Sequence, residues 1–330
     1  MNTLLEVRVE RVNSLNNSFW DEFVDQSNNG TIFHKLKFLS YHPTDRFEFH
    51  NLKFTDHNGN IKAILTGVEK DGKYISCLGA SYGSLICRDL SLIEYEKIFD
   101  CLEDYARQMD WLEIRLTPPP LFYQKNYNQV EEFLLHYKGY IPTVSLITHA
   151  ADLSRFTSRE DIDQLISDAH YRAIKKSFNS EIRVNFSDDW DSFYPMLLEN
   201  KSKFDAHPTH TLEELVKLHQ LFPMEIKLLN AYDSLNNNIA ALVLFSCNTE
   251  AVLAFYIAHY YRYQQLRAVN RLFLEAMVWA KESGYNWLDF GVSMNTQSDN
   301  LMEPSRSLIF FKEGTGAQGF RRTTYVKQLK

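Results

Sequence analysis

The chain has 330 residues and a formal net charge of -7, with 45% hydrophobic and 23% charged residues. These are ordinary values for a globular protein with room for two hydrophobic cores. There is no general excess of basic residues, so DNA binding is not expected. The cysteines, Cys77, Cys87, Cys101 and Cys247, lack metal-ligand spacing and indicate a reduced, cytoplasmic protein. The N-terminal segment is charged, unlike a signal peptide, and the longest apolar run, residues 239–245, is too short to span a bilayer.

The first half of the chain predicts a mixed α/β arrangement. Alternating apolar and polar residues indicate strands, and apolar residues at a 3.6-residue period indicate helices. The sequence Asp-His-Asn-Gly at residues 56–59 predicts a hairpin turn. The expected strands are residues 5–12, 52–55, 61–69, 74–78, 84–87, 111–116 and 143–153, and the expected helices are residues 18–27, 92–109 and 128–137.

The second half repeats this order of elements. Its first helices are expected at residues 162–178, where a break near His170 is an alternative, and at 190–204, and a third opens at the capping box of Thr211 and Glu214. Later elements follow the same periodicities: strands at residues 226–232, 239–246 and 251–259, a helix at 266–283, a strand from Trp287, a helix ending near Lys312 and a strand at 322–326.

A short internal repeat supports a duplication. In each half a long helix runs into a Trp-Leu-acid-apolar strand, at residues 111–114 and 287–290. The shared order of elements around the repeat predicts two tandem domains, residues 1–153 and 154–330. The expected class is α/β (α+β), with a mixed twisted sheet flanked by helices in each domain.

Several motifs resemble the FemAB-like branch of the GNAT acyltransferase superfamily, whose members have two tandem GNAT domains. They are Leu-Asp-Phe-Gly at residues 288–291, Phe-Lys-Glu-Gly-Thr-Gly at 311–316, Tyr-Arg-Ala-Ile-Lys-Lys at 171–176 and Phe-Tyr-Ile-Ala-His at 255–259. The resemblance implies transfer of an acyl or aminoacyl group to an amine of a cell-wall (peptidoglycan) or surface-polysaccharide precursor. The acceptor would be a sugar nucleotide or a lipid-linked molecule.

The identity of the donor is open at this point. An ordinary GNAT protein binds the pyrophosphate of CoA with a glycine-rich turn at a helix N-terminus, but the equivalent stretch here, residues 262–268, has no glycine. Arg262 and Arg267 could hold the phosphates by charge. The acidic chain and the lack of a coiled-coil arm for tRNA favour acyl-CoA, such as acetyl-CoA. The missing glycines favour aminoacyl-tRNA, or a GNAT-fold protein that binds a ligand without catalysis.

Three residues are the candidates for chemistry. The resemblance places Lys312 toward the donor, although a lysine near a helix C-terminus also favours the helix dipole without any function. Asp289, at a strand end, could orient the amine or accept its proton, or instead cap a loop or pair with Arg306. Tyr256 could donate to an oxyanion or simply belong to the core. His259 faces the opposite side of the same strand, unless a bulge alters the register.

The candidates for substrate binding are mainly basic. Arg172 and Lys175 share a helical face that could bind phosphate or be merely solvated. His207 and His210 could contact the acceptor, and Lys35 could hold an anionic one. No third ligand stands at metal spacing near the two histidines, so no metal is expected.

Overall fold

A computed structural model describes residues 6–13, 18–76 and 78–329. The chain forms two compact units, one built from Met1–Ser145 with Arg321–Lys330, and one from Leu146–Phe320. This division differs from the expected 1–153 and 154–330. Residues 146–153 pair with the second unit, and the last residues return to the first because Tyr325 pairs with Leu116.

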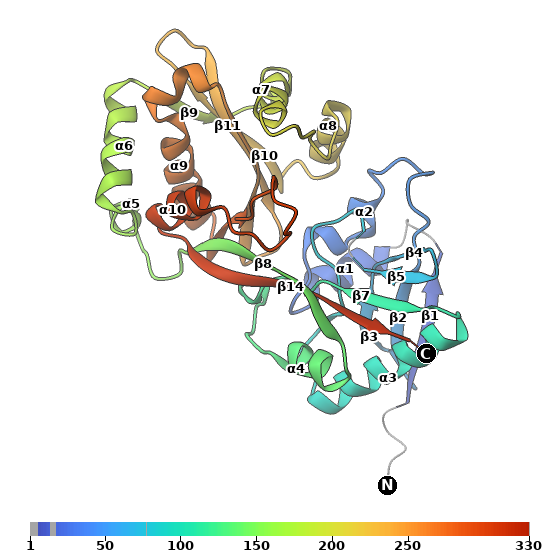
Figure 1. The fold of residues 1–330 in the computed structure, drawn as a ribbon. Helices are drawn as coiled ribbons and strands as arrows, with labels where there is room; N and C mark the ends of the chain where they lie inside the picture. Colours follow the sequence, from blue (N-terminus) through green and yellow to red (C-terminus); the bar gives the residue numbers. More distant parts are fainter. Residues whose placement is uncertain (1–5, 14–17, 77, 330) are drawn as a thin grey trace. The chain divides into compact units, whose positions relative to one another are not determined.

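The first unit has a four-stranded sheet of order β1-β2-β3-β6. It also contains the neighbouring strands β4-β5-β7-β14 of a longer sheet, and helices cover these strands (Figure 1). Its core contains Leu52, Phe54, Phe99 and Ile114. The strands are β1 (Val7–Val12), β2 (Asn51–Asp56), β3 (Ile61–Leu65), β4 (Val68–Lys70), β5 (Lys73–Ile75), β6 (Ile86–Cys87), β7 (Glu113–Leu116) and β14 (Gln318–Gln328), and the α-helices are α1 (Ser18–Gln26), α2 (Leu36–Leu39), α3 (Leu92–Gln108) and α4 (Val130–Tyr137).

The second unit contains neighbouring strands of a mixed sheet, in the order β8-β13-β12-β11-β10-β9. Helices α6 and α9 lie on one face of this sheet and α7 and α8 on the other (Figure 1). The strands are β8 (Ile141–Asp152), β9 (Arg183–Phe186), β10 (Ile226–Tyr232), β11 (Asn238–Ser246), β12 (Ala251–His259) and β13 (Trp287–Val292). The α-helices are α5 (Arg159–Asp163), α6 (Asp168–Asn179), α7 (Trp190–Ser202), α8 (Leu212–Leu221), α9 (Ala268–Glu282) and α10 (Arg306–Gly314).

Helix α9 joins the two parallel strands β12 and β13, and it is amphipathic as expected. Its buried residues include Leu272, Ala276 and Ala280, which pack in the core of the unit. Gly284 follows the helix with φ +89°, a conformation that favours glycine. This crossover fixes the relative position of the two strand ends that form the candidate site.

Some predicted boundaries were wrong. The helix expected at residues 162–178 is two helices, α5 and α6, and the break lies at residues 164–167 and not at His170. Strand β9 was missed because only four residues pair, with polar ones among them. In the described part of the chain Cys87, Cys101 and Cys247 are free thiols, and Cys77 lies outside the described residues. None of the described helices is both long and apolar enough to cross a membrane.

Candidate functional site

The two parallel strands β12 and β13 separate after a short paired region. Their ladder runs from Ala251 opposite Trp287 to Leu253 opposite Asp289. A bulge then displaces β12 at Phe255, because Leu244 of β11 pairs with Ala254 and its neighbour Val243 pairs with Tyr256. Separated strands leave main-chain N–H and C=O groups available to an extended ligand. The candidate site is built around this opening.

Lys312 of α10 lies at the end of β13. Its side chain is buried, with only 3% of the residue exposed, and its Nζ donates to the carbonyl oxygens of Gly291 at 2.6 Å and Val292 at 2.9 Å. Burial lowers the pKa of Lys312 to about 8, and the charge of Asp289 partly opposes this shift. An ammonium group has three donors, so one remains beyond the two carbonyl contacts.

The Asp289 side chain bonds the turn of backbone whose carbonyl oxygens accept hydrogen bonds from Lys312. It is fully buried, and its Oδ1 accepts from the Thr148 hydroxyl at 2.8 Å and from the Gly291 N–H at 2.8 Å. Gly291 has φ +75°, which favours glycine at this position of the Leu-Asp-Phe-Gly motif. Of the roles that the sequence suggested for Asp289, the hydrogen bonds therefore show the capping of a turn.

His149 of β8 is a neighbour of this cluster that the sequence analysis missed. It is fully buried, with Nδ1 2.8 Å from the Ser293 hydroxyl and Nε2 3.8 Å from a carboxylate oxygen of Glu313. Burial lowers its pKa and the Lys312 charge lowers it further, while Glu313 raises it. The signal in the sequence was a histidine followed by two alanines near the end of the strand expected at residues 143–153.

Tyr256 and His210 come together on the α7/α8 face of β12. The Tyr256 oxygen accepts from the Thr209 N–H at 3.1 Å, and it lies 2.6 Å from the Thr209 hydroxyl and 3.0 Å from His210 Nδ1. The bulge lets both Phe255 and Tyr256 contact the His210 ring. Burial raises the pKa of Tyr256, and the bonds from Thr209 oppose this. The single phenolic proton is therefore directed at Thr209 or His210.

The two other histidines lie apart from these contacts. His207 is exposed in the loop before α8. The His259 N–H donates to the side-chain oxygen of Asn200, whose side-chain N–H donates to the His259 carbonyl oxygen, and the His259 ring lies 4.5 Å from that of Tyr261. The bulge precedes Tyr256, so it leaves Tyr256 and His259 on opposite sides of β12. It does not bring His259 to the side of Tyr256.

The predicted phosphate-binding arginines lie in the connection from β12 to α9. Arg262 is exposed in a short 3-10 helix, with its guanidinium 4.5 Å from the Tyr260 ring and 5.1 Å from the Tyr263 ring. Arg267 is exposed at the N-cap of α9 with φ 61° and ψ 30°. A left-handed conformation there is typical of glycine, so this turn keeps a glycine-like backbone shape with an arginine side chain.

The remaining candidates lie on other elements. Arg172 and Lys175 are exposed on α6, and Lys175 Nζ lies 4.6 Å from the Tyr171 ring centre. In the first unit, Lys35 forms an ion pair with Asp25 at 2.7 Å. In the second unit, the hydrogen bonds described above connect Tyr256 with His210, and Lys312 with the turn that Asp289 caps.

The glycines of the Phe-Lys-Glu-Gly-Thr-Gly motif have a packing role. A Cβ on Gly314 would lie 2.2 Å from the His170 ring, and Gly316 has φ +94° with Leu165 close by. The Ser167 N–H also donates to the Gly314 carbonyl at 2.9 Å. These contacts hold the end of α10 against the start of α6, and they fix the helix that carries Lys312.

The fold is the FemAB-like double-GNAT fold, in which one chain contains two GNAT-like units. No protein-family model and no curated protein matches the sequence. Similar structures include FemX, with a TM-score of 0.71, 11% identity and 97% of both chains covered. L-PGS from Bacillus licheniformis has a TM-score of 0.60 and 11% identity over 96% of this chain and 93% of that one.

A tandem GNAT protein from the clavulanic acid biosynthesis pathway, in a structure without AcCoA, has a TM-score of 0.54 and 10% identity over 98% of both chains. At such identities the likeness concerns the fold. Among the described residues, no group of three or more His, Cys, Asp or Glu side chains could hold a metal ion.

Proposed function

We propose that the protein transfers an acyl or aminoacyl group from an activated donor to an amine. The observation that carries this proposal is the opening between the parallel strands β12 and β13, with the buried Lys312 at its edge, in a tandem GNAT fold. The family resemblance of the motifs around residues 255–320 points to the same reaction.

Acyl-CoA is the donor that we propose. An extended thioester can pair with the main-chain groups of β12 beyond Leu253, where the ladder to β13 ends. Its phosphates would lie near the start of α9, where Arg262 and Arg267 are exposed. Aminoacyl-tRNA is the alternative donor, because an arginine stands where a phosphate-binding glycine is usual.

The chemistry follows from the chain's own groups. A neutral amine attacks the thioester carbon, a C–N bond forms, the C–S bond breaks, and the products are an amide and a thiol. The third N–H of Lys312 can donate a hydrogen bond near the reacting atoms. Lys312 can also protonate the departing thiolate, because its pKa of about 8 is close to the ordinary pKa of a thiol, about 8.5. The proton of the amine can pass by way of His149 to the exposed Glu313.

The acceptor that we propose is an amine on a sugar-nucleotide or lipid-linked precursor of a cell-wall or surface polysaccharide, met in the cytoplasm. This part rests on the family resemblance. His210, beside Tyr256, and His207, in the loop before α8, remain the proposed contacts with the acceptor. Arg172 on α6 and Lys35 in the first unit remain separate candidates for binding an anion, and Lys175 lines a groove of its own.

The test is a thiol-release assay with acetyl-CoA and a panel of UDP-amino sugars. We expect at least one amine to be acylated, and Lys312→Met to lose most of that turnover while Lys176→Met, on exposed α6, keeps it. A chain that binds acyl-CoA but acylates no amine, with or without added aminoacyl-tRNA, would support a non-catalytic binding protein instead. Full turnover in Lys312→Met would remove Lys312 from the chemistry.

A further inference from the structure

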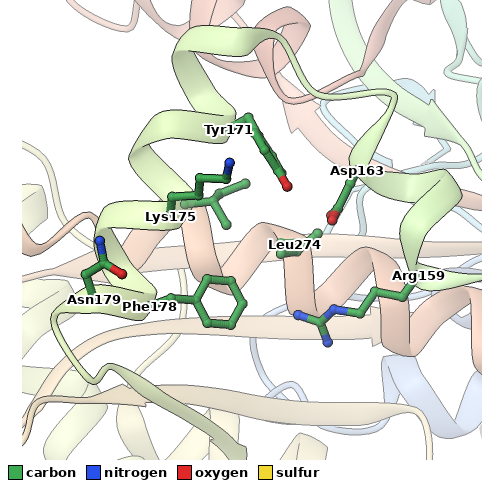
Figure 2. A pocket seen from close by; sticks show the side chains of 8 residues that line it. Arg159, Asp163, Tyr171, Lys175, Phe178, Asn179 and Leu274 are labelled. Atoms are coloured by element: carbon green, nitrogen blue, oxygen red, sulfur yellow. The ribbon is translucent and has the colours of Figure 1, made fainter.

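A groove lies on the helical layer of the second unit, between α5, α6 and α9 (Figure 2). Its volume is about 350 Å³. A cavity of this size is at the lower end of those that hold small ligands. The lining residues are Arg159, Asp163, Tyr171, Ile174, Lys175, Phe178, Asn179 and Leu274.

The floor and sides of the groove are apolar. Ile174 and Leu274 are each 1% exposed and belong to the core of the unit. The rings of Tyr171 and Phe178 flank them, and Phe178 is fixed on one face by the Arg271 guanidinium, 3.4 Å from the ring centre. Such a surface accepts an aliphatic or aromatic group of a ligand.

Two charged groups of the groove have no ion partner among the described residues. One is Asp163, whose Oδ1 is buried without a hydrogen-bond partner there. Burial raises the pKa of Asp163, although the Arg159 charge opposes this. The other is Lys175, whose ammonium contacts the face of Tyr171. Figure 2 shows the Tyr171 hydroxyl and the Asp163 carboxylate pointing toward one another.

The other charges of the region are already compensated. Arg159 makes two hydrogen bonds to Glu275, at 2.7 Å and 3.2 Å, and Arg271 Nε donates to the same carboxylate at 2.6 Å. Among the described residues, the groove therefore presents the Asp163 carboxylate and the Lys175 ammonium without ion-pair partners, beside an apolar floor. A buried polar group without a partner is costly, so a ligand that supplies its partner gains binding free energy.

We propose that this groove binds a small zwitterion of the α-amino-acid type with an apolar side chain. The ligand ammonium would meet Asp163, its carboxylate would meet Lys175, and its side chain would cover Leu274. A phosphate or sugar phosphate would satisfy Lys175 but would be repelled by Asp163, and a simple cation would be repelled by Lys175. The site does not depend on the proposed acyl transfer.

The test is calorimetric titration of the full chain with leucine and phenylalanine, beside N-acetyl-leucine, leucinamide and inorganic phosphate. We expect saturable binding of the free amino acids, and binding of the two blocked compounds that is at least about tenfold weaker, since each lacks one charge. Asp163→Asn and Lys175→Met should each weaken binding by about tenfold or more, because a charged hydrogen bond is lost. Lys176→Met is the matched control on the same helix and should bind as the original chain does.

Three results would contradict the proposal. No saturable binding of any amino acid up to about 10 mM would overturn the proposal, since such a ligand would be too weak to count as specific. Unchanged binding in Asp163→Asn, or phosphate binding that is tighter than amino-acid binding, would do the same. Asp163→Asn is nearly isosteric, and an unchanged melting temperature shows that the variant is folded.

Discussion

The ammonium of Lys312 lies 2.6 Å from the carbonyl oxygen of Gly291, and the N–H of that same glycine is held by Asp289 at 2.8 Å. One residue of backbone thus connects the buried cation with the buried acid. Because Gly291 lies just beyond the last paired residues of β12 and β13, the two contacts set the shape of the opening.

Lys312 should make stability depend on pH in the alkaline range. Its pKa is about 8 in the folded chain against 10.5 ordinarily, so between these values the unfolded chain binds more protons and stability rises with pH. We expect the original chain to gain about 3 kcal/mol of unfolding free energy relative to Lys312→Met across this window. Urea unfolding of both proteins at pH 8 and pH 10 measures the difference, and parallel pH curves would contradict it.

Asp289→Asn should change the charge of the site while it keeps the shape. The amide oxygen can still accept from Thr148 and Gly291. Because the Asp289 charge holds the pKa of Lys312 up, its loss should move that pKa below about 8. We expect the pH–rate profile, measured with acetyl-CoA as the proposed donor, to shift toward acid. Thr148→Val removes one hydrogen bond without a charge and should leave the profile in place.

The Tyr256 hydroxyl should contribute to both stability and turnover. Tyr256→Phe leaves the Thr209 N–H and the His210 ring without that partner, and we expect a loss of about 1–3 kcal/mol of stability. If the hydroxyl also contacts the substrate, turnover should fall by at least about tenfold. Thr209→Val is the control that disturbs the same contacts but keeps the hydroxyl. Equal losses of turnover in both variants would limit Tyr256 to a positioning role.

Gly314 should be intolerant of a side chain because of His170. A Cβ there would come within 2.2 Å of the His170 ring, and we expect Gly314→Ala to cost about 1–3 kcal/mol by overpacking. The second substitution His170→Ala should restore much of this loss, since it removes the obstructing ring. Thermal unfolding of the single and double variants gives the coupling, and simple additivity would show that another contact is responsible.

Glu131 of the first unit should make stability fall as pH rises. Burial raises the pKa of Glu131 to about 7, and the hydrogen bond from the Ser84 hydroxyl opposes this shift. Between pH 4.5 and pH 7 the folded chain therefore holds a proton that the unfolded chain has released, so stability decreases through this window. Relative to Glu131→Gln, the original chain should lose about 3 kcal/mol from pH 4.5 to pH 7. A difference between the two that does not vary with pH would refute this.

Much of the fold could be predicted from periodicity, because α9, β12 and β13 have strong local patterns. The motif at residues 311–316 also placed Lys312 on a helix. What could not be predicted was tertiary. His149 lies on β8 and Asp289 on β13, far apart along the chain, and the pairing of β8 with β13 brings them together. Likewise, the bulge at Phe255 that turns Tyr256 toward His210 leaves no mark in the alternation of residues.

The return of β14 to pair with β7 has a consequence for synthesis of the chain. Lys327 and Gln328 pair with Ile114 and Glu113, so the first unit receives strand β14 only after residues 146–320 have been synthesised. Residues 146–320 form, in effect, an insertion within that unit. The second unit can become compact while the first unit still lacks strand β14. Deletion of residues 321–329 should therefore destabilise the first unit, and a cut between the expected domains should not yield two independent folding units.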